Sequence, residues 1–103
     1  MSLFSPLTVD GIYMANRLVR SATGEGACVP DVGCASDAMA EFYGRLAAGG
    51  VGLIVTVHTA VSFEGRCSAT MSALYSDEFV PAFAKMAEAS HGAVAPIVMQ
   101  LNN

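Results

Sequence analysis

The segment from Ala47 to Arg66, AAGGVGLIVTVHTAVSFEGR, decides the fold. Gly49 and Gly50 suit the end of a helix, because glycine adopts the left-handed backbone found there at least cost. Residues 51–57 are almost all apolar and rich in β-branched side chains, which predicts a strand buried on both faces of a parallel sheet. A parallel strand needs crossover elements, so the segment predicts an α/β chain. Functional groups in such folds gather beyond the carboxyl ends of the strands, where His58 follows.

Length and composition limit the classes of protein to consider. A chain of 103 residues forms at most one small domain, and 53% hydrophobic with 14% charged residues supplies a core and excludes general disorder. A net charge of −4 with five basic residues argues against a nucleic-acid surface. No apolar run approaches the ~20 residues of a membrane helix, and no signal-peptide layout opens the chain. Three cysteines in no recognised framework favour a cytoplasmic location.

Other strands are expected on both sides of the central one. Residues 3–16 predict a hairpin around Asp10-Gly11, a dipeptide that favours tight turns. Residues 18–22, LVRSA, are the first candidate for a parallel strand of a barrel or sheet, and residues 96–101, PIVMQL, predict a third buried strand. The sequence therefore predicts a hairpin followed by three parallel strands.

Two amphipathic helices are expected between these strands. The first covers residues 37–48 with Ser36 as its N-cap, and the second covers residues 76–90 with Pro81 in its first turn. His91-Gly92 is expected to close the second helix. The apolar faces follow three-four spacing and comprise Met39, Phe42, Tyr43, Leu46 and Ala47 in the first helix and Phe79, Val80, Phe83, Met86 and Ala87 in the second.

Long loops are predicted from strand to helix, over residues 23–35 and 58–75, and short ones from helix to strand. Strand-to-helix loops build the active face of α/β folds. Three strands leave the outer two with unpaired edges, and a complete (β/α)8 barrel takes ~250 residues. The chain is expected to be the opening part of something larger.

Six short segments occur along the chain in a fixed order, and together they span nearly all of it. They are LFSPLT (3–8), NRLV (16–19), GGVGLI (49–54), AVSFEGR (60–66), LYSDE (74–78) and QL (100–101). This ordered set resembles the N-terminal part of the old yellow enzyme family, the FMN-dependent NAD(P)H:flavin oxidoreductases. Residues 20–23, RSAT, are most similar to its enoate-reductase-like and NADH-oxidase-like branch.

The resemblance implies an α/β fold that is the N-terminal part of a (β/α)8 TIM barrel, incomplete on its own. Residues 1–103 would form one fragment of the barrel domain, with the hairpin at 3–16 and a strand–helix–strand–helix–strand unit at 17–103. It implies FMN as cofactor and NAD(P)H as hydride donor, with hydride passing through the flavin to an activated alkene, an enoate or enone. An iron–sulfur cluster or FAD would belong only to parts not present here.

The resemblance also implies cofactor-binding residues at the three strand ends. Ala22, Thr23 and Gly24 follow the first strand, His58 the second, and Gln100 the third. The Gln100 amide both donates and accepts hydrogen bonds, as the pyrimidine edge of a flavin requires. His58 stands where the family usually has a small residue, so its imidazole either contacts the flavin or faces solvent.

Other positions depart from the family pattern. Ala22 stands where many members have Pro, Gly24 where many have Cys or Thr, and Asn103 where most have His. No catalytic residue is assigned, because the substrate-binding pair and the proton-donating Tyr belong to later parts of the family pattern. No metal site is expected, since the spacing of Cys28, Cys34 and Cys67 fits no standard metal framework.

Two functions remain open. In the first, the chain belongs to a flavin oxidoreductase and acts on a small-molecule alkene only with the remaining barrel portion, supplied by a second chain or a longer parent. The isolated chain is then expected to be inactive. In the second, it is a non-catalytic remnant or subunit that forms a homo-oligomer through exposed sheet edges, without redox activity. Neither requires a nucleic acid or a membrane.

Overall fold

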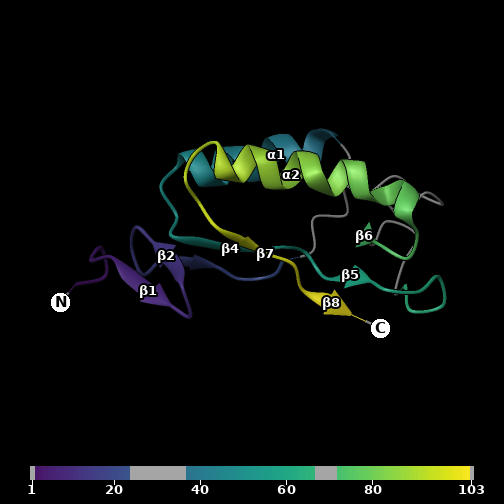
Figure 1. Ribbon diagram of the computed structural model, residues 1–103, viewed down its shortest axis with the longest axis horizontal. Helices are drawn as coiled ribbons and strands as arrows, with labels where there is room; N and C mark the ends of the chain where they lie inside the picture. Colours follow the sequence, from purple (N-terminus) through teal and green to yellow (C-terminus); the bar gives the residue numbers. More distant parts are fainter. Residues whose placement is uncertain (1, 24–36, 67–71, 103) are drawn as a thin grey trace.

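The computed structural model describes residues 2–23, 37–66 and 72–102. Two helices lie side by side over a layer of short strands, and a small hairpin extends from one end of that layer (Figure 1). The elements in chain order are β1 (Leu7–Val9), β2 (Ile12–Met14), β3 (Val19–Arg20), α1 (Asp37–Ala48), β4 (Leu53–Val55), β5 (Thr59–Ala60), β6 (Ser72–Ala73), the 3-10 helix η1 (Asp77–Phe79), α2 (Val80–His91), β7 (Ile97–Val98) and β8 (Leu101–Asn102).

The hairpin forms where the sequence predicts it. Strands β1 and β2 pair antiparallel, with Leu7 opposite Met14 and Val9 opposite Ile12. Asp10 and Gly11 form the two-residue turn with φ angles of 48° and 83°. Two successive positive φ angles define the type I′ turn, whose twist matches that of the flanking strands.

The central sheet is parallel, in the order β3-β4-β7. Helices α1 and α2 lie on the same face of this sheet (Figure 1). Ile54 is fully buried in the core beneath them, whereas Leu53 and Val55 are only half-buried. The expectation of a strand buried on both faces is therefore wrong for the described residues, because both helices cover one face. The core comprises Met39, Tyr43, Ala47, Ile54, Val57, Phe79, Phe83, Met86 and Ala95.

The first helix has the bounds expected from the sequence, and Gly50 beyond it has a φ of 98°. The second begins differently, because residues 77–79 form the 3-10 helix η1 before α2 starts at Val80. Val80 does not belong to the apolar face, since its side chain is 49% exposed. Ser36, the expected N-cap, lies outside the described residues.

Helix α2 ends at His91 with Gly92 as its C-cap, where the sequence expects it to close. Gly92 has an ordinary helical φ of −60°, and Val94 is the left-handed residue with a φ of 65°. The N–H of Val94 donates to the His91 carbonyl at 2.9 Å, and the N–H of Ala95 donates to the Ser90 carbonyl at 3.1 Å. These two bonds form the Schellman closure of a helix, in which glycine usually takes the position of Val94.

A second small sheet lies beyond the carboxyl ends of β4 and β7 (Figure 1). Its strands are parallel and ordered β6-β5-β8. The expectation of one continuous loop over residues 58–75 is wrong here, because β5 and β6 lie inside that range. The paired residues are small or polar, so composition hides them, yet Ala60 and Ala73 are completely buried and Ser72 is nearly so.

Candidate functional site

The carboxyl ends of the three central strands meet at an open cavity of about 200 Å³. Its lining consists of Ala22 and Thr23 after β3, His58 after β4, and Gln100 after β7. These are four of the five residues that the sequence singled out for cofactor binding. The fifth, Gly24, lies outside the described residues. The parallel order β3-β4-β7 explains this convergence, because neighbouring parallel strands end at the same edge of a sheet.

Gln100 is held by its main chain on both sides. Its N–H donates to the Thr56 hydroxyl oxygen at 3.1 Å, and its carbonyl accepts the Thr59 N–H at 2.9 Å. The side chain is exposed at the cavity. A primary amide offers two donors and a carbonyl acceptor, so this position can bind a ligand edge that carries both kinds of group.

A change of register brings His58 opposite Gln100. Val55 pairs with Val98 in the central sheet, but Thr59 pairs with Leu101 in the second sheet. The β4–β5 segment therefore carries one more residue than the β7–β8 segment over the same length, as in a β-bulge. The Thr56 hydroxyl accepts the Gln100 N–H at this point, where the regular ladder is interrupted.

His58 is half-buried and has a defined partner. The side-chain nitrogen Nδ2 of Asn102 lies 3.3 Å from His58 Nδ1. Thr23, on the other side of the cavity, donates its hydroxyl proton to the Ser21 carbonyl at 3.1 Å. The hydroxyl oxygen of Thr23 thus keeps its acceptor capacity for a ligand.

Three supporting residues were not identified from the sequence. Tyr43, Thr56 and Asn102 hold the cavity residues or their immediate neighbours through hydrogen bonds. The sequence could have pointed to Thr56, because Thr56 is the one hydroxyl-bearing residue in the apolar run 51–57. No local pattern points to Tyr43 or Asn102, since their hydrogen-bond partners are distant in the sequence.

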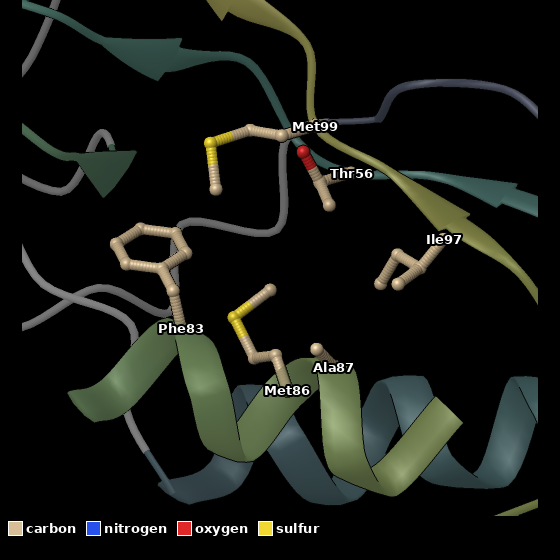
Figure 2. A pocket seen from close by; sticks show the side chains of 6 residues that line it. All are labelled: Thr56, Phe83, Met86, Ala87, Ile97 and Met99. Atoms are coloured by element: carbon tan, nitrogen blue, oxygen red, sulfur yellow. The ribbon is translucent and has the colours of Figure 1, made fainter. Parts of the chain in front are cut away.

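Two further cavities have mainly apolar walls. One, of about 150 Å³, lies between α2 and β7, and Met86 and Met99 line it from these two sides (Figure 2). The Thr56 hydroxyl at its edge already bonds the Gln100 N–H and the Val57 carbonyl. The other, of about 360 Å³, lies between the hairpin and the central sheet and includes Met14, Val19 and Leu53. Neither offers the convergent polar groups of the strand-end cavity.

The described part of the chain was compared with the requirements of a metal site and of a membrane-spanning helix. Residues 2–23, 37–66 and 72–102 contain no group of three or more His, Cys, Asp or Glu side chains placed to hold a metal ion. Neither helix in these ranges has the length and apolar character needed to cross a membrane.

Comparison with known proteins places the chain in a family. Residues 2–103 match the NADH:flavin oxidoreductase / NADH oxidase family. An NADPH dehydrogenase of Geobacillus sp. (strain WCH70) is 36% identical over 93 residues, which cover 88% of this chain and 27% of that protein. An NADH oxidase of Thermoanaerobacter brockii is 30% identical over 103 residues, covering 99% of this chain and 16% of that protein.

Solved structures give the same relationship. The old yellow enzyme homologue from Zymomonas mobilis superposes with a TM-score of 0.91 at 28% identity, over 100% of this chain and 28% of that one. Old Yellow Enzyme from Pichia sp. AKU4542 superposes with a TM-score of 0.91 at 32% identity, over 98% of this chain and 26% of that one. The chain thus spans between a sixth and a third of the length of these relatives.

The match over nearly the whole chain and the close superposition agree with the ordered segments of the sequence. The chain belongs to the NADH:flavin oxidoreductase / NADH oxidase family, and it corresponds to the N-terminal portion of the old yellow enzymes.

Proposed function

We propose that this chain is the N-terminal part of an FMN-dependent oxidoreductase of the ene-reductase type, one that passes hydride from NAD(P)H through flavin to an activated alkene. The observation that carries the proposal is the cavity at the ends of β3, β4 and β7, lined by Thr23, His58 and Gln100 in a chain of this family. Ligands of α/β folds bind at the carboxyl ends of the strands.

The polar groups of the cavity fit one edge of a flavin ring. The Gln100 amide supplies donors and an acceptor, and the Thr23 oxygen supplies an acceptor because its proton goes to the Ser21 carbonyl. Ala22 adds a small apolar wall beside them. We assign these residues, with His58 and Gly24, to binding and orienting FMN. The flavin, when bound, supplies the hydride chemistry, and the protein supplies position and hydrogen bonds.

The catalytic acid and the substrate-binding pair are proposed to lie outside this chain, as would any iron–sulfur or FAD module. We place β3, β4 and β7 as the first three strands of an eight-stranded barrel, completed by a second chain or by a longer parent. Open apolar surface supports this placement: Val19 is 49% exposed and Val98 is 41% exposed at the two outer strands. The isolated chain is then inactive, and its location is the cytoplasm.

A second candidate function is a non-catalytic subunit that forms a homo-oligomer. The same two outer strands favour it, because each has an edge unpaired among the described residues. Leu101, which is 62% exposed on β8, adds apolar surface to the edge of the second sheet. Unpaired edges and exposed apolar side chains promote association of strands between chains.

Native mass spectrometry with an absorbance scan separates the two candidates. We expect a yellow complex in which this chain is joined by a polypeptide of roughly 150 residues or more, since a complete barrel takes about 250. A colourless homo-oligomer that does not take up added FMN would reject the oxidoreductase and support the second candidate. Uptake of FMN by the homo-oligomer would support the proposed flavin site and would show that no different polypeptide is needed to complete it.

A further inference from the structure

The contact between His58 and Asn102 fixes the position of a proton. The Asn102 side-chain nitrogen lies 3.3 Å from His58 Nδ1, and an amide nitrogen only donates hydrogen bonds. Nδ1 must therefore be the acceptor, so the single proton of the neutral imidazole is on Nε2. The Nε2–H is the group that this arrangement leaves for a ligand.

The pair is held by the second sheet. Asn102 lies on β8 and pairs with Ala60 on β5, and its carbonyl accepts the Val61 N–H at 3.0 Å. His58 comes directly before β5, and both side chains of the pair are half-buried. The main chain therefore fixes both partners before any ligand arrives, which lowers the entropic cost of binding.

We propose that Asn102 is a positioning residue that keeps neutral His58 in the Nε2–H tautomer, so that His58 donates a hydrogen bond to an acceptor atom of the bound flavin. This inference rests on the proposed function, because it takes FMN as the occupant of the cavity lined by His58, Thr23 and Gln100. It assigns His58 to contact with the flavin and Asn102 to action through His58.

The neighbouring groups give the donor a specific role. The Thr23 hydroxyl donates its hydrogen bond to the Ser21 carbonyl, so its oxygen can act only as an acceptor toward the cavity. His58 in the Nε2–H tautomer adds a donor on the β4 side, where the family resemblance implies a small side chain. The opposite tautomer would present a lone pair instead and would repel a flavin carbonyl oxygen.

Selective ¹⁵N labelling of histidine in the full chain tests the tautomer directly. The chain has two histidines, His58 and the exposed His91, so His91→Gln assigns both ring systems. Only this chain is labelled, so only two imidazoles are seen even in a complex. At pH 8 we expect His58 to show a protonated Nε2 and a hydrogen-bonded, unprotonated Nδ1.

Substitutions at Asn102 test its part in this arrangement. Asn102→Leu removes the donor, and the His58 Nδ1 resonance is expected to lose its hydrogen-bond shift. Asn102→Asp replaces the donor by an acceptor, and the proton is expected to move to Nδ1. The backbone amide spectrum checks that each variant is folded. If Asn102→Asp does not fold, the wild-type tautomer and Asn102→Leu decide the result.

FMN addition to the labelled protein, within the complex if one is found, tests the flavin contact. We expect the Nε2–H resonance of His58 to move while that of His91 stays. Flavin that binds by absorbance with no change at His58 would overturn the inference and leave the proposed function standing. Absence of flavin binding would reject the proposed function together with the contact. A protonated Nδ1 in the wild type, or random-coil signals from both histidines, would overturn the role of Asn102.

Discussion

The hydroxyl oxygen of Tyr43 on α1 accepts a hydrogen bond of 2.8 Å from the backbone N–H of Val57, the residue before His58. Tyr43 is completely buried, and its ring packs edge to face against Phe42 at 5.8 Å. The bond joins the helix layer to the strand end that leads into the cavity. A core side chain thus supports the position of a site residue.

Tyr43→Phe removes this acceptor and leaves the Val57 N–H buried without it. We expect a loss of about 1–3 kcal/mol in the free energy of unfolding, the cost of an unsatisfied buried polar group. Urea unfolding of the full chain measures it. Tyr13→Phe is the matched control, because the Tyr13 side chain is 55% exposed on β2. Equal losses in the two variants would contradict a special role for the Tyr43 hydroxyl.

Gly52→Ala should be destabilising because of Asn16. The Asn16 amide donates to the Gly50 carbonyl at 2.6 Å and accepts the Leu18 N–H at 3.0 Å, which fixes it beside β4. A Cβ atom at position 52 would overlap both the main-chain and the side-chain oxygen of Asn16. We expect a loss of about 1–3 kcal/mol, typical of overpacking, in urea unfolding.

Gly49→Ala is the control for this substitution. A Cβ atom at position 49 would have its nearest neighbours at ordinary contact distances of 3.4 and 3.5 Å. We expect a change within about 0.5 kcal/mol, as for most surface substitutions. A Gly52→Ala variant as stable as Gly49→Ala would show that the Asn16 segment moves aside at little cost.

Val94→Gly is expected to stabilise the protein. Val94 has a left-handed φ of 65° and is 75% exposed, so the substitution relieves backbone strain and removes little packing. The expected gain is about 0.5–1 kcal/mol after the entropy of the added glycine is subtracted. Val61→Gly, at an exposed position with negative φ, should lower stability instead. A change of the same sign in the free energy of unfolding at both sites would show that the backbone of Val94 is not strained.

Gln100→Leu is expected to weaken FMN binding by about tenfold. In the proposed flavin site, two hydrogen bonds from the Gln100 amide, worth about 0.5–1.5 kcal/mol each, would be lost, and 1.4 kcal/mol corresponds to a factor of ten. Quenching of FMN fluorescence measures the dissociation constant. Thr8→Val on β1 is the control, because the hairpin lies at the other end of the molecule (Figure 1). Unchanged affinity in Gln100→Leu would remove Gln100 from the flavin site.

Val98→Lys should block assembly on the open side of the sheet. Val98 is 41% exposed on the outer strand β7, and a lysine covered there by a partner would be a buried, unpaired charge. We expect assembly to weaken by about tenfold or more in native mass spectrometry. Val80→Lys is the control, since Val80 is 49% exposed on α2. Equal assembly of both variants would place the partner elsewhere.

Local patterns predicted much of the fold. The hairpin turn at Asp10-Gly11 and helix α1 follow from preferences that act over a few residues, and the structure has both where the sequence expected them. The second sheet was missed, because its strands are two residues long and their pairing joins distant segments. Helix α2 ends at His91-Gly92 as expected, but the left-handed residue beyond it was not predicted, because it is Val94 and not a glycine.

The candidate site divides in the same way. Gln100 and Thr23 were found through the family resemblance, which implies cofactor contacts at strand ends, and residues in that place converge in a parallel sheet. Asn102 was not found, because its contact with His58 depends on the register of β5 against β8. Register is set by tertiary packing, so a sequence pattern along one segment does not contain it.

Because of the extra residue between Val55 and Thr59, the site depends on the number of residues in this segment as well as on which residues they are. Side chains alternate between the faces of a strand, so insertion or deletion of one residue at positions 56–57 would turn His58 to the other face relative to Gln100. A substitution there leaves that alternation intact. Among related sequences, a histidine and a glutamine at the two strand ends would therefore form one cavity only where the spacing from each strand is also kept.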